Sequence, residues 1–283
     1  MNGFFYIDKQ SDWTSRDVCN KIQKIFNLPK VGHIGTLDPF ATGLLIVCVG
    51  SGTKASTFFD DDEKEYEATL SLGKKTSTGD LTGEVVEEKE VKEFNEEDII
   101  KVFLSLTGEI EQLVPMTSAV HVNGVKLYQY LHKGVEVERP TRKVFVKSLE
   151  LLSFDNKTIT FKAVVSKGTY IRVLGEDIAF KLGTVGHLIA LRRVRVGSAS
   201  VKNAKTLDEV SKDDLMPIQE LLHDIPHFVL SGEKLVQAKH GMTISIDTEQ
   251  NNDKILILDD DGNVVAMYGH SHKNFYKCLR GLA

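Results

Sequence analysis

The segment GHIGTLDPFATGLLIVCVG, residues 32–50, constrains the fold more than any other part of the chain. Its second half contains Leu44–Val49, a run of six apolar residues, which is typical of a strand buried on both faces. Its first half places glycine, threonine and proline around a single carboxylate, Asp38. Glycine permits tight turns, and Pro39 fixes its own φ and biases Asp38 toward an extended conformation. The pattern therefore predicts a stiff loop that holds Asp38 at the mouth of a buried strand.

The rest of the chain alternates strands and helices without a regular βαβ period, which favours an α+β fold with a mostly antiparallel sheet. Besides Leu44–Val49, strands are expected at Phe4–Asp8, Glu65–Leu72, Val144–Phe154, Thr158–Ser166 and Leu188–Val196. Helices are expected from a cap at Thr14 or Ser15 up to Pro29, and at or near Thr53–Phe59, Glu96–Leu106, Leu127–Lys133, Tyr170–Leu182 and Leu207–Leu215.

Two prolines, Pro217 and Pro226, mark a plausible domain boundary. Beyond them the chain has three short strand patterns, Thr243–Ile246, Lys254–Leu258 and Val264–Tyr268, with a turn at residues 259–262. We therefore expect a large domain over residues 1–225 and a small β-rich module over residues 226–283. The length of 283 residues is sufficient for a substantial core in the first of these.

Composition indicates where the protein acts. The longest apolar run is far shorter than the roughly 20 residues that span a bilayer, and the first residues, MNGFFYIDKQ, lack the pattern of a signal peptide. The three cysteines are far apart, which fits a reducing compartment better than a disulfide framework. We expect a cytoplasmic protein that does not associate with membranes.

Charge is distributed unevenly. The net charge is −5, yet residues 166–205 carry eight lysines and arginines against two acids. A local basic face can attract a polyanion on an acidic protein, because screening makes nearby charges matter most. The simpler interpretation is a solvated surface with uneven charge.

Asp38 has three possible interpretations from the residues alone. It can act as a nucleophile held in a rigid loop, or it can only shape the turn, as Asp commonly does. A phosphate-binding loop is less consistent, because no Gly-Lys-Ser/Thr follows and the downstream segment is a strand.

GHIGTLDPFATGLL closely resembles the nucleophile motif of the TruB family of tRNA pseudouridine synthases. Other blocks resemble the family in the same order: Leu72-Gly73 with Thr76, Thr78, Asp80 and Gly83; PMTSAVHVNGVKLYQYLHKG; SKGTYIRVLGEDIAFKLG; and HLIALRRVRVG. The resemblance runs from about residue 3 to about residue 225, and the tail resembles a PUA-like module more weakly. One departure lies at Lys9–Ser15, where the family usually has Lys-Pro-x-Gly-x-Thr/Ser-Ser and this chain lacks the Pro and the Gly.

The resemblance implies a pseudouridine synthase fold, with a mixed central sheet flanked by helices and loops. It also implies isomerisation of uridine at position 55 in the TΨC arm of tRNA, by base flipping, in a protein expected to be a monomer. This isomerisation is redox-neutral and releases no phosphate, so we expect no cofactor and no metal. The histidine pairs His223/His227 and His270/His272 lack zinc-like surroundings in the sequence.

The resemblance also assigns roles to individual residues. Asp38 is the expected nucleophile, attacking uracil C6 or ribose C1′, and Arg172 is the cation that keeps it ionised. Tyr66 is the expected platform for the flipped base, Tyr170 and Leu191 line the pocket, and His33 helps to hold the RNA. From pattern alone, Tyr66, Tyr170 and Leu191 would be core residues, His33 a structural histidine, and Arg172 a surface or phosphate-binding arginine.

Two other functions fit parts of the sequence. A non-catalytic RNA-binding or RNA-remodelling protein could keep the same scaffold, and the altered Lys9–Ser15 segment is the feature that supports it. A phosphate-cleaving enzyme could use His33 and Asp38, and would be expected to need a divalent metal.

Overall fold

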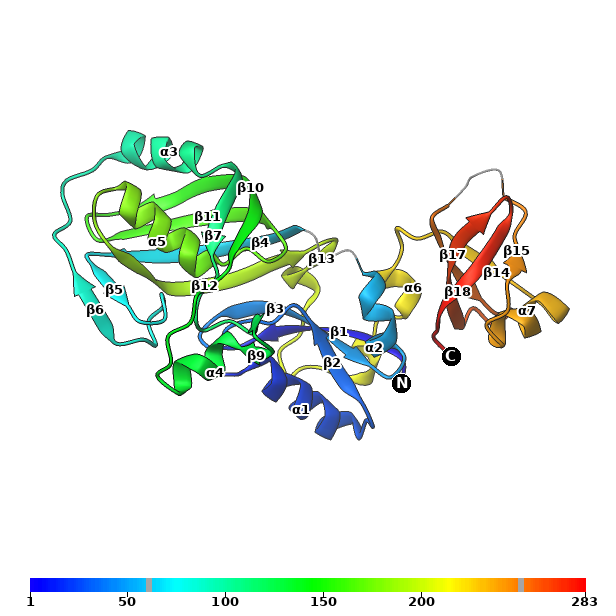
Figure 1. Cartoon of the computed structure of the whole chain (residues 1–283). Helices are drawn as coiled ribbons and strands as arrows, with labels where there is room; N and C mark the ends of the chain where they lie inside the picture. The colour runs from blue at the N-terminus through cyan, green and yellow to red at the C-terminus, as the bar shows by residue number, and fades with distance from the viewer. Residues whose placement is uncertain (60–62, 249–251) are drawn as a thin grey trace.

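The computed structural model describes residues 1–59, 63–248 and 252–283. A large sheet forms the body of the protein, with a second sheet to one side of it (Figure 1). The order across the large sheet is β1 (Gly3–Lys9), β3 (Thr42–Val49), β12 (Gly186–Val196), β4 (Glu63–Leu72), β11 (Thr158–Ser166), β10 (Thr141–Phe154) and β7 (Gly108–Leu113). Two further strands, β2 (Val31–Ile34) and β13 (Ala199–Ser200), pair with β3 and β12. Within the part described, β3 and β12 pair in parallel and the other ladders of this sheet are antiparallel, so the predicted mixed, mostly antiparallel sheet is confirmed.

Strand β3 is buried on both of its faces, as its apolar run predicts. Successive side chains of a strand point to opposite faces. Leu45, Val47 and Val49 therefore pack into one apolar cluster, and Leu44, Ile46 and Cys48 pack into another. Because β3 packs between the two clusters, the loop that precedes it ends at a firmly held strand.

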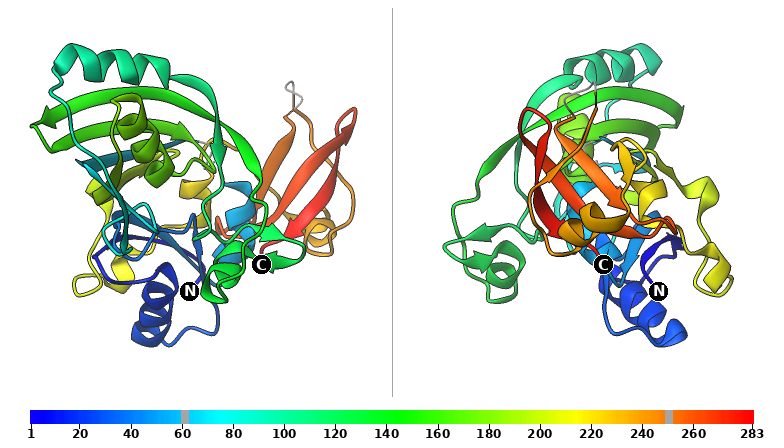
Figure 2. Two further views of the ribbon diagram at one scale, coloured as in Figure 1. Left: turned by 60° about the vertical axis from the view of Figure 1, so that its left-hand side comes forward. Right: turned by 90° about the vertical axis from the view of Figure 1, so that its right-hand side faces the viewer.

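Three helices begin or pack where their sequences predict. Capping boxes at Thr14/Asp17 and Asn95/Asp98 start α1 (Ser15–Phe26) and α3 (Glu96–Ser105). The third, α5 (Ile171–Lys181), packs on β12 and β4 through Leu174 and Ile178. Figure 2 shows the sheet from two further directions, with the α3 ribbon beside the green strands β10 and β11, where Phe103 of α3 packs against Phe161 of β11.

Shorter elements complete the body. They are α2 (Gly52–Ala55), α4 (Leu127–His132), α6 (Ile218–Leu221), and the two small hairpins of β5 (Lys74–Thr76) with β6 (Val85–Glu88) and β8 (His121–Val122) with β9 (Val125–Lys126). The right-hand view of Figure 2 shows the green segment that contains α4 projecting from the body.

The predicted helix near Leu207–Leu215 is wrong. This stretch forms turns and one 3-10 turn at Lys212–Asp214. Ser211 caps that turn and accepts from the backbone N–H of Asp213, while the Asp214 carboxylate accepts from Ser211 in return. A capping box in the middle of the segment starts a new turn there, so a single helix cannot run through it.

The second sheet is formed by β14 (His227–Val229), β16 (Lys254–Leu258), β17 (Val264–His272), β18 (Phe275–Gly281) and β15 (Ile244–Ser245), with α7 (Gly232–Lys239) beside it. It contacts the body through a buried cluster that includes Phe4, Leu256 and Met267. The predicted strands at Lys254–Leu258 and Val264–Tyr268 are confirmed, whereas the division at residues 225 and 226 stays a prediction. Among the helices described here, none has the length and apolar character that crossing a membrane requires.

The altered segment Lys9–Ser15 keeps a tight turn. Asp12 stands where the family pattern has glycine, and its φ is 67°, in the left-handed region that glycine adopts most easily. The Asp12 N–H donates to the carbonyl oxygen of Pro39 at 2.9 Å. Aspartate is among the residues that tolerate this conformation, so the loop keeps its contact with the Asp38 loop without the glycine.

This geometry predicts the effect of substitutions at Asp12 on stability. Asp12→Gly should leave the free energy of unfolding unchanged or raise it by up to about 1 kcal/mol, because relief of strain is partly offset by a more flexible unfolded chain. Asp12→Val should lower it by roughly 1–2 kcal/mol, because a β-branched residue fits this region poorly. Urea unfolding of both variants, with Asp12→Asn as the control, measures this. A valine variant as stable as the wild type would contradict the assigned backbone conformation.

Candidate active site

Asp38 lies in the loop between β2 and β3, and this loop is tied to the first turn of α1. The Ser15 side chain, which is 2% exposed, accepts from the Leu37 N–H at 2.9 Å and donates to the Leu37 carbonyl at 3.1 Å. The Ala41 N–H closes the turn on the Asp38 carbonyl at 3.1 Å. The predicted stiff loop is therefore present, and the Asp38 side chain remains 33% exposed.

Arg172 meets Asp38 from the first turn of α5. Its Nε lies 2.9 Å from Asp38 Oδ2, and its Nη2 donates to Asp38 Oδ1 at 3.2 Å. The two parallel contacts form a bidentate pair, which fixes direction as well as charge. The Arg172 side chain is 5% exposed, so its charge is not dispersed by solvent.

The remaining nitrogen of Arg172, Nη1, contacts groups that are not among the site residues predicted from the sequence. Arg172 Nη1 donates to the Thr78 carbonyl at 2.8 Å and to the Thr117 hydroxyl, and it lies 3.6 Å from Asp80 Oδ2. Asp80 is itself buried and accepts from the Thr78 hydroxyl at 2.8 Å and the Thr82 N–H at 3.0 Å. Both Asp80 and Thr117 lie in blocks that resemble the family, and this is the signal that could have drawn attention to them.

Burial and neighbouring charges act on Asp38 in opposite directions. Removal from water is the largest effect, and it raises the pKa of Asp38 above its ordinary value. Arg172 opposes this rise by its charge and its hydrogen bond, Asp80 adds to it, and Lys9 lowers the pKa to a smaller extent. The net effect is a raised pKa, so the carboxylate ionises at a higher pH than a free Asp does.

The large sheet brings two predicted site residues, Tyr66 and Leu191, close to the Asp38 loop. Gly43 pairs with Arg193 across β3 and β12, and Arg193 pairs with Tyr66 across β12 and β4. Tyr66 is 8% exposed and Leu191 6% exposed, and both share an apolar cluster with Leu37. Most of the Tyr66 ring therefore already packs in the core, and only a small part is open to solvent.

Tyr170 and His33 are held by other neighbours. The Tyr170 N–H donates to Gln112 Oε1 at 2.9 Å, and Gln112 Nε2 donates to the Tyr170 carbonyl at 3.2 Å, so a buried glutamine fixes the residue that precedes α5. His33 Nδ1 lies 3.5 Å from the Cys19 sulfur and its Nε2 lies 3.3 Å from the Thr36 hydroxyl. Neither residue contacts Asp38 among the described interactions, so their roles at the site stay predictions.

The basic segment 166–205 is less available for phosphate than its charge predicts. Arg172 is paired with Asp38, Arg192 with Asp8 at 2.7 Å, and Arg195 with Glu63 at 2.6 Å. Arg193 is fully buried. Half of the eight cations in this segment therefore serve internal contacts rather than an open face.

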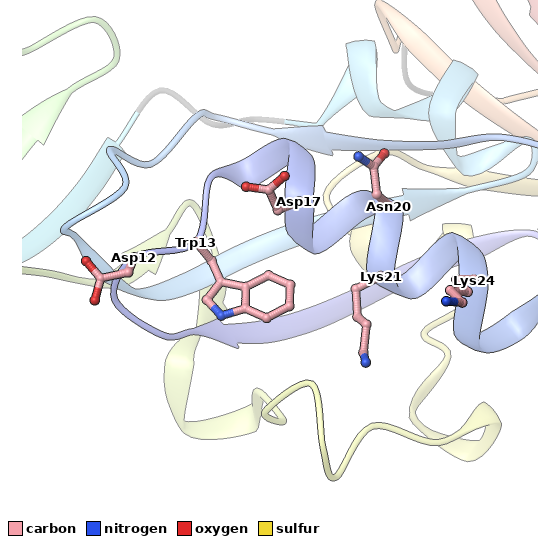
Figure 3. A pocket seen from close by; sticks show the side chains of 6 residues that line it. All are labelled: Asp12, Trp13, Asp17, Asn20, Lys21 and Lys24. Atoms are coloured by element: carbon pink, nitrogen blue, oxygen red, sulfur yellow. The ribbon is translucent and has the colours of Figure 1, made fainter.

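A hollow of about 470 Å³ lies along α1 and is separate from these residues. It is lined by Asp12, Trp13, Asp17, Asn20, Lys21 and Lys24, and Figure 3 shows these side chains along the helix and the loop before it. Asp38 and Arg172 are not among the residues that line it. Over residues 1–59, 63–248 and 252–283, no group of three or more His, Cys, Asp or Glu side chains is arranged to hold a metal ion.

Two models of known protein families match consecutive parts of the chain. Residues 23–171 match the model of the TruB family pseudouridylate synthase (N terminal domain), and residues 172–237 match the tRNA pseudouridylate synthase B C-terminal domain. The tRNA pseudouridine synthase B of Acholeplasma laidlawii is 37% identical over 268 residues, covering 95% of each chain. That of Caldicellulosiruptor saccharolyticus is 43% identical over 229 residues, covering 78% of this chain and 77% of the relative.

The fold also matches solved structures. A crystal structure of a Cbf5-Nop10-Gar1 complex contains a chain with a TM-score of 0.73 and 23% sequence identity, covering 99% of this chain and 85% of that one. This likeness confirms the predicted fold class, and the β-rich C-terminal part agrees with a PUA-like module. From the family match over more than half of its length and the identity to curated relatives, the chain belongs to the TruB family of pseudouridylate synthases.

Proposed function

We propose that this protein isomerises uridine to pseudouridine at position 55 in the TΨC arm of tRNA, with Asp38 as the nucleophile. Membership of the TruB family supports the reaction and the class of RNA. The position in tRNA follows from the resemblance of the sequence blocks to the family, and the role of Asp38 follows from that resemblance together with its pairing to Arg172. We also expect the protein to act as a monomer in the cytoplasm.

The observation that carries this proposal is the bidentate pair between Asp38 and Arg172. The pair aims an ionised oxygen from a rigid loop while a third of the Asp38 side chain remains accessible. A covalent mechanism needs a nucleophile that is charged, positioned and reachable. Arg172 supplies the first two of these properties, and the exposed part of Asp38 supplies the third.

The reaction exchanges one glycosidic bond for another. Asp38 bonds to uracil C6 or to ribose C1′, the N1–C1′ bond breaks, and the ring turns so that C5 bonds to C1′. The proton on C5 is then released, N1 takes up a proton from water in exchange, and Asp38 leaves with its original charge. No electron acceptor and no phosphate transfer is needed for this balance.

The other site residues receive roles that match their positions. Because a base must leave its stack before Asp38 can reach it, we assign Tyr66 as the surface against which the flipped ring packs. Tyr170 and Leu191 are proposed to line the pocket, and His33 to contact the RNA next to it. We expect recognition to rely on the shape of the folded arm and on a splayed base.

The non-catalytic alternative has less support than its sequence basis suggested. That basis was the altered Lys9–Ser15 segment, and the structure keeps the turn there through Asp12. For a phosphate-cleaving enzyme, His33 would have to act with Asp38, whereas its ring contacts Cys19 and Thr36.

Release of tritium from uracil C5 tests the proposal directly. A tRNA transcript tritiated at C5 of its uridines should lose the label at position 55 on incubation with the protein, and a transcript with cytidine at position 55 should not. Asp38→Asn should abolish release while tRNA binding persists, because the amide is a poor nucleophile. Asp12→Asn, which changes an exposed carboxylate on a neighbouring loop, is the matched control. Full release by Asp38→Asn would assign the nucleophile elsewhere, and tRNA binding without any release would favour the non-catalytic alternative.

The pH dependence of turnover tests the role of Arg172. The reaction needs ionised Asp38, so the rate should fall as pH falls through the pKa of that group, which lies above the ordinary 3.8. The low-pH side of the pH–rate profile, where the rate falls, is its acid limb. Arg172→Gln removes the main influence that lowers the pKa of Asp38 and should move this limb about 1–3 units to higher pH. Arg172→Lys keeps a cation but loses the bidentate geometry of the guanidinium. The rate on the pH-independent plateau should therefore fall at least about tenfold, and the acid limb should move less than in Arg172→Gln.

Single-turnover rates from pH 4 to 8 measure both effects. If Arg172→Gln is too slow to follow, a carbon-13 NMR titration of the Asp38 carboxyl reports the same pKa. An acid limb that does not move in Arg172→Gln would remove Arg172 from the electrostatics of the site.

Substitution of Tyr66 separates its two possible roles. Tyr66→Leu keeps apolar volume in the core but removes the aromatic face, which is worth about 1–3 kcal/mol in stacking. It should therefore slow turnover by roughly 5- to 150-fold with little change in tRNA affinity, because the phosphate backbone supplies most of the binding. Tyr66→Phe is the control and should retain activity. Equal turnover in the two variants would leave Tyr66 as a core residue only.

A further inference from the structure

Two buried cations lie on either side of the loop that carries Asp38. Lys9 at the end of β1 and Arg193 on β12 are both 0% exposed. Burial of a charge costs several kcal/mol unless the charge is paired and hydrogen-bonded. Within the described part of the chain neither residue forms an ion pair with a carboxylate, so their placement needs another explanation.

The ammonium group of Lys9 joins the segment after β1 to the Asp38 loop through backbone carbonyls. Its ammonium group donates to the carbonyls of Gln10 at 2.9 Å, Trp13 at 2.7 Å and Pro39 at 3.0 Å. An ammonium has three donors, so each is used. Pro39 directly follows Asp38, and the contact therefore fixes the backbone one residue from the nucleophile.

Arg193 holds the start of the loop. Its Nη2 donates to the Gly35 carbonyl at 2.8 Å and its Nε to the Leu44 carbonyl at 2.8 Å, with a longer contact of 3.5 Å from Nη1 to the Thr36 carbonyl. Gly35 has a φ of 64°, and a Cβ there would lie 3.2 Å from Arg193 Nη1. The guanidinium thus ties the start of the loop to β3, the strand that follows it.

The sheet brings these two side chains together through one glycine. Lys9 pairs with Gly43 across β1 and β3, and Gly43 pairs with Arg193 across β3 and β12. Gly43 has a φ of 98°, and a Cβ at this position would lie 2.3 Å from the Arg193 carbonyl oxygen. Only a residue without a side chain lets β12 approach closely enough for Arg193 to reach the loop.

We propose that Lys9 and Arg193 are positioning residues for Asp38. Arg193 holds the start of its loop through the carbonyls of Gly35 and Thr36, and Lys9 holds it through the carbonyl of Pro39 and also brings a positive charge toward the carboxylate. Neither touches the substrate, and both act through the loop. This inference rests on the proposed function only in that Asp38 must be aimed and ionised for turnover.

The charges around Asp38 and Lys9 support a role for the charge of Lys9. Asp38 faces Arg172 from α5, Asp80 from the loop between β5 and β6, and Lys9 from β1, and of these Lys9 and Arg172 favour its ionised form. Lys9 in turn faces Asp38, Asp12 and Arg193, and burial lowers the pKa of Lys9 to about 8. Lys9 therefore keeps its charge through neutral pH while it holds Pro39.

Two substitutions separate the charge from the geometry. Lys9→Met keeps the length of the side chain but removes both the charge and the donors. It should lower the single-turnover plateau about 10- to 100-fold and move the acid limb to higher pH, by less than Arg172→Gln does. Arg193→Lys keeps a charge but loses the fork, so its plateau should fall similarly while the acid limb stays in place.

The neighbouring strand positions supply the control. Arg192→Met breaks the ion pair of Arg192 with Asp8, which joins the same two parts of the sheet through more exposed side chains. It should leave both the plateau and the acid limb unchanged. If Lys9→Met does not fold, Lys9→Gln keeps an amide donor without the charge and is measured in its place.

A carbon-13 NMR titration of the Asp38 carboxyl gives a second readout that does not depend on turnover. A raised pKa of Asp38 in Lys9→Met and an unchanged one in Arg193→Lys would support the proposal. Variants that lose only thermal stability, with the wild-type plateau, acid limb and Asp38 pKa, would overturn it. A wild-type protein that releases no tritium would instead refute the proposed function, and the NMR titration would still decide this inference.

Discussion

The bidentate contact between Arg172 and Asp38 is the constraint around which the site is arranged. An arginine that is 5% exposed must have its donors satisfied, or its burial would destabilise the fold by several kcal/mol. The chain satisfies them with groups from three segments that meet the first turn of α5: the loop before β3, the loop between β5 and β6, and the segment after β7. Folding of the body and assembly of the site are therefore the same event.

The site balances two opposing demands on one carboxylate. A nucleophile that reacts with a flipped base needs a pocket with little water, and removal of water raises the pKa of Asp38. Arg172 favours the ionised form and so opposes this rise, while Asp80 lies against the same guanidinium and adds to the rise. The resulting carboxylate is paired with Arg172 while part of its side chain stays open for a substrate atom.

Much of the fold is predictable from local sequence, and less of the site is. Periodicity and capping predict α1, α3 and β3, because these elements depend on neighbouring residues. The stretch at Leu207–Leu215 fails as a helix because a cap at Ser211 interrupts it. Asp38 and Arg172 are 134 residues apart, so only the family resemblance joined them. The contacts of Thr117 and Asp80 depend on how distant loops meet, and the arginines of segment 166–205 are drawn into internal pairs that a count of charges cannot reveal.

The structure depends for its function on one proposed role, in which the Asp38 carboxylate is the nucleophile that attacks a flipped uridine. A crystal structure of the Asp38→Asn variant bound to an RNA stem-loop of the TΨC arm tests this most directly. We expect uridine 55 outside the base stack, with C6 or C1′ about 3–3.5 Å from the side chain of residue 38 and the ring against Tyr66. A uridine that remains stacked in the loop, or one whose ring lies against a different carboxylate, would contradict it.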